Sequence, residues 1–146
     1  MIEKTGNIWD EPCDWICVTT NGMLRSDGKA VMGAGIALQA KKKYKGIDVT
    51  LAKKLKERGN VVSLIAKDGK KLILSFPTKH HWKDKYDMDL IRKSALQLKF
   101  YFNEAKIKPI VAIPRPGCRN GGLLWENVRK VLAPILVEDN FIVMDN

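Results

Sequence analysis

Short apolar runs alternate with longer stretches of helical periodicity along this 146-residue chain, and no other feature restricts its fold as much. Three of the runs are rich in β-branched side chains, as buried strands are, namely residues 15–19, 110–113 and 141–144. Two more flank Asp68-Gly69 and are expected to pair as a hairpin, residues 61–67 and 71–76. Apolar positions recur at helical spacing in residues 36–44, 49–58, 87–105 and 124–136. This alternation predicts an α/β fold with three layers, α/β/α, around a central mixed, largely parallel sheet.

Length and hydrophobic content predict a single domain over residues 1–146. A chain of this size with 45% hydrophobic residues buries one core and leaves no room for a second. It has no apolar stretch of about 18 residues, and Met1-Ile2-Glu3-Lys4 lacks the basic and then apolar pattern of a signal peptide. We therefore expect a soluble, cytoplasmic protein without a membrane partner, and a monomer, because nothing in the sequence indicates an oligomer.

The cysteines and histidines argue against a disulfide framework and against a zinc site. Cys13, Cys17 and Cys118 form no CxxC pair, and the two histidines, His80 and His81, are adjacent. We expect reduced thiols, no metal and no cofactor.

The net charge of +10 favours anionic partners. Lysines cluster in residues 41–43, 53–54, 67–71 and 79–85. Such runs are typical either of a solvated lysine-rich surface or of a surface that binds nucleic acid. Charge alone favours the solvated surface, and nucleic acid remains a candidate partner.

Two glycine-rich loops indicate a phosphate site. Gly33-Ala34-Gly35 opens the expected helix 36–44, and residues 117–122 follow the expected strand 110–113. A glycine-rich turn before a helix presents free backbone N–H groups and the positive end of the helix dipole. The first loop matches neither a Rossmann fingerprint nor a P-loop, so alone it is as consistent with a structural turn. Two such loops at the carboxyl ends of parallel strands could hold a diphosphate from both sides.

Asn21 and Lys79 are the candidate polar groups beside these loops. Asn21 directly follows an apolar strand, where its carboxamide could bind a sugar diol or simply stabilise a turn. Lys79 follows Pro77-Thr78 in an expected loop, residues 77–86, and its neutral amine could form a Schiff base with a sugar aldehyde. From local sequence alone Lys79 is more typical of a surface lysine. Trp82 could stack on a base, whereas Cys118 has no nearby base partner to make it a nucleophile.

Four motifs together resemble the macro domain family over essentially the whole chain. They are Thr20-Asn21-Gly22, the run from Val31 to Ala37, the run from Pro114 to Val128, and Phe76-Pro77-Thr78-Lys79-His80-His81-Trp82. The last is similar to the segment that carries the catalytic lysine of the DarG antitoxin, a DNA ADP-ribosyl glycohydrolase. The sequence therefore resembles the branch that contains this antitoxin and the terminal ADP-ribose protein glycohydrolase.

The resemblance implies a role for each matching residue. It implies that Lys79 acts at the anomeric carbon and that Asn21 lies at the distal ribose, so these two are the candidate catalytic residues. It also implies that ADP-ribose is bound by Asn7 and Ile8 at the adenine, and by Met32, Gly33, Ala34, Gly35, Ile36, Pro116, Gly117, Cys118, Arg119, Asn120, Gly121, Gly122 and Leu123 at and beside the diphosphate.

Three residues depart from the family pattern. Asn7 stands where many macro domains have an adenine-binding Asp. Gly121 stands where the protein glycohydrolase has its second catalytic residue, an Asp, so that enzyme's lysine-aspartate mechanism does not transfer. Arg119 replaces a usual loop glycine, and it could either contact phosphate or narrow the entrance.

We therefore expect an ADP-ribose-binding hydrolase that removes ADP-ribose from modified DNA or protein through Lys79. One alternative is an ADP-ribose 1''-phosphate phosphatase, which Gly6-Asn7-Ile8 and the missing Asp favour. Another is a reader that binds ADP-ribose without turnover. A basic nucleic-acid module without an ADP-ribose pocket is disfavoured, because the charge is dispersed and no nucleic-acid-binding motif occurs.

Overall fold

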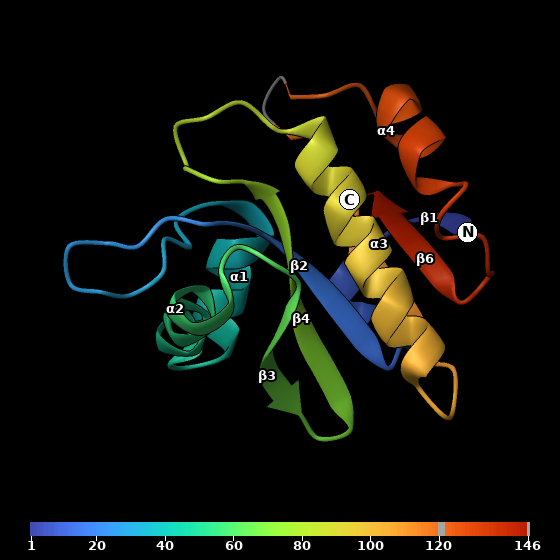
Figure 1. The fold of residues 1–146 in the computed structure, drawn as a ribbon. Coiled ribbons are helices and arrows are strands. Elements are labelled where there is room, and N and C mark those ends of the chain that lie inside the picture. The colour runs from blue at the N-terminus through green and yellow to red at the C-terminus, as the bar shows by residue number, and fades with distance from the viewer. Residues whose placement is uncertain (120–121, 146) are drawn as a thin grey trace.

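A twisted sheet runs through the molecule in the computed structural model, which describes residues 1–119 and 122–145 (Figure 1). Its strand order is β1-β6-β5-β2-β4-β3. The bounds are β1 Ile2–Thr5, β2 Trp15–Asn21, β3 Ser63–Asp68, β4 Lys71–Lys79, β5 Val111–Pro114 and β6 Phe141–Asp145. All neighbouring strands pair in parallel except β3 and β4, which form an antiparallel hairpin at one edge. The predicted mixed, largely parallel sheet is confirmed.

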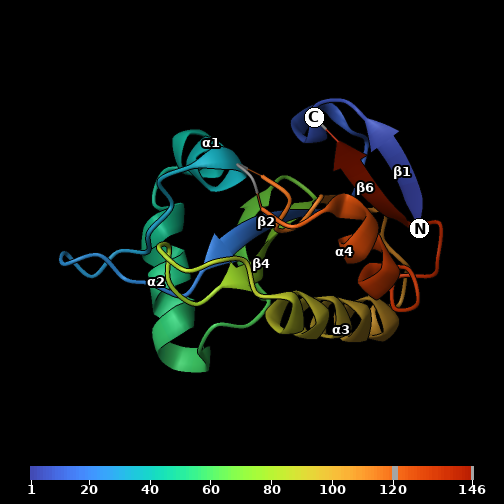
Figure 2. The same ribbon diagram turned by 90° about the horizontal axis from the view of Figure 1, so that it is seen from above.

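Helices cover both faces of this sheet and complete the predicted three layers (Figure 2). Their bounds are η1 Ile8–Asp10, a 3-10 helix, α1 Gly35–Lys43, α2 Ile47–Arg58, α3 Met88–Glu104 and α4 Trp125–Leu132. Ile16 and Val18 of β2 belong to the core beneath α1 and α2, whereas Cys17 between them belongs to the core beneath α3 and α4. Alternate residues of a strand point to opposite faces, so one strand contributes to both cores.

Local sequence explains where the long helix begins and which face it buries. Asp87 caps α3, because its Oδ1 accepts hydrogen bonds from the backbone N–H groups of Asp89 (3.0 Å) and Leu90 (3.2 Å). The buried positions of α3 recur every three or four residues, namely Leu90, Ile91, Ser94, Ala95, Leu98 and Phe102. They form the apolar stripe that the periodicity predicts. Neither α3 nor any other helix of the described residues is both long and apolar enough to cross a membrane.

Two predicted boundaries differ most from the structure, and one strand was not predicted. Strand β4 continues through Pro77 and Thr78 to Lys79, which therefore ends a strand rather than lying in a loop. Helix α4 ends at Leu132, four residues before the predicted end, and Pro134, which has no N–H group to continue the helical hydrogen bonds, follows two residues later. Strand β1 was not predicted, since its residues are exposed on both faces and show no apolar alternation.

Candidate functional site

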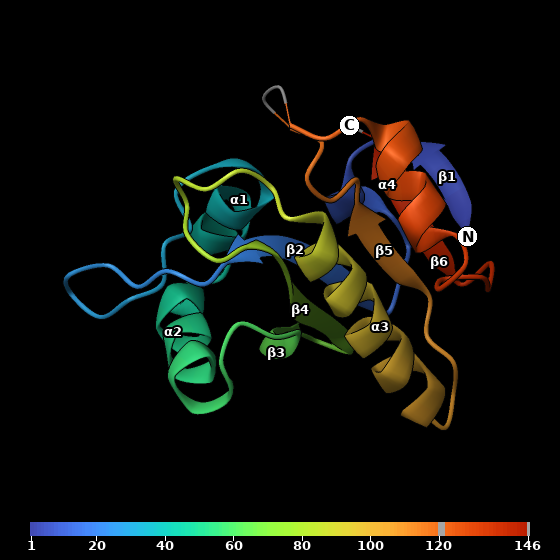
Figure 3. The same cartoon turned by 45° about the horizontal axis from the view of Figure 1, so that its top comes forward.

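Two adjoining cavities lie where the parallel strands end. The first has a volume of about 570 Å³ and the second about 480 Å³. Four residues line both, Thr19, Ile36, Tyr86 and Arg119. Figure 3 shows the start of α1 and the segment between β4 and α3, which both contribute residues to the wall of the second cavity. The two cavities together form one elongated crevice at the carboxyl edge of the sheet, as predicted for a parallel α/β sheet.

Lys79 and Asn21 lie next to each other in the second cavity. They are register partners at the carboxyl ends of β4 and β2, although they are far apart in sequence. The Asn21 carboxamide is oriented by the following loop, because its Oδ1 accepts from the Met23 N–H (3.0 Å) and its Nδ2 donates to the Val31 carbonyl (3.4 Å). The structure thus brings together the two residues predicted to act at the distal ribose.

Tyr86 positions the Lys79 amine. The Lys79 Nζ lies 4.3 Å from the centroid of the Tyr86 ring and donates a hydrogen bond to the Trp82 carbonyl (3.4 Å). Asn60 holds the main chain at this point, since its Nδ2 donates to the Lys79 carbonyl (2.9 Å). These contacts direct the half-buried lysine side chain along the wall of the second cavity.

Tyr86 also packs against the loop that follows β5. A Cβ atom at Gly122 would overlap the Gly117 carbonyl oxygen and lie 2.6 Å from Cε2 of Tyr86. The Gly117 carbonyl accepts the N–H of Leu123 (2.8 Å), which folds this loop back on itself. Only glycine fits at position 122. Because it has no side chain, the backbone can approach the Tyr86 ring closely.

Arg119 occupies the junction of the two cavities. Helix α1 begins at Gly35, its N-cap Ala34 makes no side-chain hydrogen bond, and its first turn contains no acidic residue. A Cβ atom at Gly35 would overlap Nη1 of Arg119 and lie 3.1 Å from Cζ, so the guanidinium rests directly on this helix end. Within the part of the chain that the structure describes, no carboxylate forms a salt bridge with Arg119. A guanidinium beside a positive helix end favours an anion at the junction.

Ion pairs support the far wall of the first cavity. The Glu3 carboxylate accepts the indole N–H of Trp125 (2.7 Å), and an Arg115 nitrogen lies 3.8 Å from the same carboxylate. A second Arg115 nitrogen lies 3.5 Å from Asp145. Strand β1, which carries Glu3, thereby fixes Trp125 at the edge of the crevice.

Most of the predicted binding residues line the crevice. They are Ile8, Asn21, Gly33, Ala34, Gly35, Ile36, Lys79, Gly117, Cys118, Arg119 and Leu123. Gly122 lines neither cavity but packs against Tyr86, which lines both. Asn120 and Gly121 lie outside the described residues.

Three predicted binding residues are placed away from the two cavities. Met32 is buried in the core beneath α1 and α2, and Pro116 is buried within its loop. The Asn7 side chain caps η1 by accepting the Trp9 N–H (3.0 Å) and borders a third hollow, which shares only Gln39 with the first cavity. Among the predicted adenine residues, only Ile8 lines the first cavity.

Sequence reasoning missed several residues that line the crevice, Thr19, Gln39, Tyr86 and Asp145 among them. Asp145 carries the same signal as Asn21, a polar residue at the end of an apolar strand. Tyr86 carries no comparable signal, because its role depends on packing against Lys79 and against a loop much further along the chain.

Cys118 is unsuited to act as a thiolate. Burial raises the pKa of its thiol, and the neighbouring Arg115 lowers that pKa by less. The thiol donates to the Pro116 carbonyl (3.5 Å). A raised pKa leaves less of the thiol as thiolate, so this environment does not activate Cys118.

The chain is similar in sequence to known glycohydrolases, although no family model matches it. It is 36% identical over 127 residues to a DNA ADP-ribosyl glycohydrolase of Mycobacterium tuberculosis, an alignment that covers 76% of the chain and 36% of that protein. It is 31% identical over 104 residues to the ADP-ribose glycohydrolase OARD1 of Bos taurus, covering 71% of the chain and 66% of that protein. The chain thus spans about a third of the length of the DNA glycohydrolase.

A solved structure agrees with these relatives. The macrodomain of Mycobacterium tuberculosis DarG superposes with a TM-score of 0.81 at 27% identity, over 99% of the chain and 97% of that domain. The likeness therefore extends over the whole fold as well as over the aligned sequence. The chain belongs to the macro domain family, in the branch that contains DarG and OARD1.

Proposed function

We propose that this chain removes ADP-ribose from modified DNA and that Lys79 is its catalytic residue. The observation that carries the proposal is the position of the Lys79 amine beside Asn21, in a crevice whose two adjoining cavities of about 570 Å³ and 480 Å³ offer the volume of a dinucleotide-sized ligand. The names of the relatives support hydrolysis of ADP-ribose linkages, and the DNA glycohydrolase supports DNA as the carrier.

The crevice accommodates ADP-ribose in one direction. The adenosine occupies the first cavity, which apolar residues such as Ile8 and Leu124 line. The diphosphate lies at the junction, where Arg119 and the first N–H groups of α1 are available. The distal ribose then enters the second cavity, and its C1'' atom faces Lys79.

The chemistry requires a neutral amine. The Lys79 nitrogen attacks C1'', the bond from C1'' to the DNA base breaks, and the base takes the proton that the nitrogen loses. Opening of the ribose ring gives a Schiff base. Water adds to the Schiff base and expels the amine, which releases ADP-ribose and restores Lys79. Tyr86 holds the amine in place through contact with its ring face.

Release of ADP-ribose from a single-stranded oligonucleotide that carries one ADP-ribosylated thymidine tests this role. We expect Lys79→Ala to reduce the rate on the order of a thousand-fold. Lys79→Arg should be equally inactive, because arginine keeps the charge but never offers a neutral nucleophile. Lys45→Ala, a change of an exposed lysine outside the crevice, is the control.

Borohydride reduction during turnover separates the covalent role from an electrostatic one. We expect trapping of a stable adduct on Lys79 with the native protein. Substantial release by Lys79→Arg without any trapped adduct would contradict the covalent role. Tight binding of ADP-ribose with no release from modified DNA or protein would show a reader, and phosphate release from ADP-ribose 1''-phosphate would show a phosphatase.

A further inference from the structure

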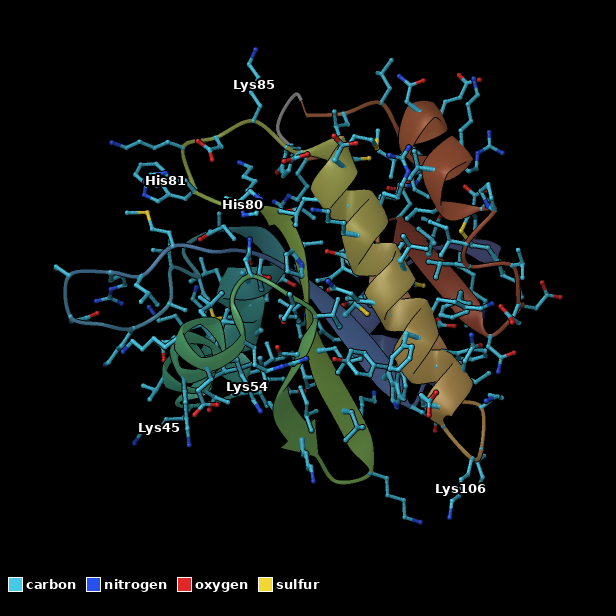
Figure 4. All side chains as sticks on the ribbon, viewed as in Figure 1. Lys45, Lys54, His80, His81, Lys85 and Lys106 are labelled. Carbon is cyan, nitrogen blue, oxygen red and sulfur yellow. The ribbon has the colours of Figure 1, made fainter. Side chains whose placement is uncertain are left out.

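The segment between β4 and α3 carries aromatic and basic side chains on the rim of the second cavity. Residues 80–85, here called the rim loop, read His-His-Trp-Lys-Asp-Lys and begin directly after Lys79. In Figure 4, His81 and Lys85 point outward from the end of the molecule at which β4 finishes, whereas Lys45 and Lys106 lie toward the opposite end. Nothing in the proposed reaction at C1'' uses these outward side chains.

Trp82 is an exposed aromatic residue next to Lys79. Its side chain is 49% exposed although it lines the second cavity, and its carbonyl accepts the hydrogen bond from Lys79. The His81 ring lies 6.0 Å from the Trp82 ring at an interplanar angle of 23°, and the Lys83 Nζ lies 5.2 Å from the Trp82 ring centroid. An exposed aromatic ring with cations beside it is typical of sites that bind single-stranded nucleic acid.

Hydrogen bonds hold the rim loop in shape. The Asp87 N–H donates to the Thr78 carbonyl (3.0 Å) and closes the base of the segment. Within it, the Lys83 N–H donates to Nδ1 of His81 (3.0 Å) and the Asp84 N–H donates to the His81 carbonyl (3.0 Å). The tryptophan is thus presented on a preformed turn, which lowers the entropy cost of binding.

Charge along this rim is positive. Lys83 and Lys85 are exposed, and Asp84 is the one carboxylate among residues 80–85. The Asp87 carboxylate caps α3, and among the described residues it forms no salt bridge with either lysine. If a DNA strand leaves the second cavity and crosses Trp82, its phosphate groups lie beside these two lysines.

We propose that the rim loop binds the single-stranded DNA that flanks the modified base, an inference that rests on the proposed function. A base joined to C1'' must enter the mouth of the second cavity, which a base stacked and paired within a duplex cannot do. The unpaired strand then lies across the loop. Trp82 stacks on a base, and Lys83 and Lys85 contact the neighbouring phosphates.

Turnover of modified oligonucleotides distinguishes DNA binding by the rim loop from a general effect of the protein's positive charge. The variant Lys83→Ala/Lys85→Ala is compared with Lys45→Ala/Lys106→Ala, which removes the same charge from exposed positions elsewhere. Trp82→Ala is compared with Phe100→Ala, a change of an aromatic residue that is 59% exposed on α3. The substrates are the single-stranded oligonucleotide with one ADP-ribosylated thymidine, its duplex form and an ADP-ribosylated protein. Calorimetry with free ADP-ribose reports on the crevice itself.

For both rim-loop variants we expect kcat/KM on the single strand to fall about ten-fold, mainly through KM. In the lysine variant, the slope of log KM against log salt should decrease by about 0.7 for each phosphate that the loop no longer neutralises. Both control variants should match the native protein, and the duplex should be a poor substrate. Affinity for free ADP-ribose and turnover of the modified protein should not change in the lysine variant.

Equal losses in the rim-loop and control variants, equal losses on protein and DNA, or no loss at all would overturn the inference. These outcomes differ from failure of the proposed function, in which the native protein itself releases no ADP-ribose from the oligonucleotide.

Discussion

The guanidinium of Arg119 rests on Gly35 where the two cavities meet, a position that the usual loop glycine would leave open. Because hydrogen bonds to charged groups contribute about 1.5–3 kcal/mol each, we expect Arg119→Ala to weaken ADP-ribose binding roughly ten- to a hundred-fold. Arg119→Lys should retain part of the affinity, since lysine keeps the charge but loses the planar fork. Isothermal titration calorimetry with ADP-ribose measures both changes.

Adenosine serves as the matched ligand for this measurement. It has no diphosphate, so its affinity should be the same for the native protein and for Arg119→Ala. Tighter binding of ADP-ribose by Arg119→Ala would show instead that the side chain narrows the crevice.

At the scale of an element, the start of α3 determines where the rim loop and Tyr86 lie. The Asp87 carboxylate accepts two backbone N–H groups, whereas Asp89 in the first turn pairs with Arg92 on the surface. We expect Asp87→Ala to lower the free energy of unfolding by about 1 kcal/mol, the usual contribution of an N-cap. Asp89→Ala should lower it by only a few tenths of a kcal/mol. Urea unfolding followed by circular dichroism compares the two.

Both variants remove one negative charge from the same helix end. The difference between them therefore isolates the cap from the helix dipole. Equal destabilisation by the two changes would mean that capping is not what stabilises this turn.

At the scale of the whole molecule, one sheet separates two cores, and both cores depend on it. Leu51 of α2 is buried in one core and Leu98 of α3 in the other. We expect Leu51→Ala and Leu98→Ala each to lower the free energy of unfolding by about 2–5 kcal/mol. In both, circular dichroism and tryptophan fluorescence should report one coincident transition, because shared strands make the cores unfold together. Separate transitions for the two probes would contradict this.

Local patterns explain which elements could be predicted. Strand β2 was identified from its short apolar run, and helix α3 from apolar residues that recur every three or four positions. Strand β1 lacked that pattern, because it is an exposed edge strand that pairs only with β6. The last residues of β4 were expected in a loop, and Pro77 has no N–H group to donate to a neighbouring strand. Pairing with β2 and the hydrogen bond from the Ser94 hydroxyl to the Pro77 carbonyl (2.7 Å) keep them in the strand.

By itself, the sequence determined the order of the α-helices and of every strand except β1, and it placed glycine-rich loops, Asn21 and Lys79 at or shortly after strand ends, because these signals lie in neighbouring residues. The tertiary structure alone decided that Asn21 and Lys79 become register partners, that Tyr86 packs against Lys79, and that Arg119 rests on Gly35. Each of these contacts depends on the order of the strands in the sheet and on packing between elements of the fold. Such contacts form only when burial of the two cores brings the strand ends to one edge of the sheet, so no local pattern encodes them.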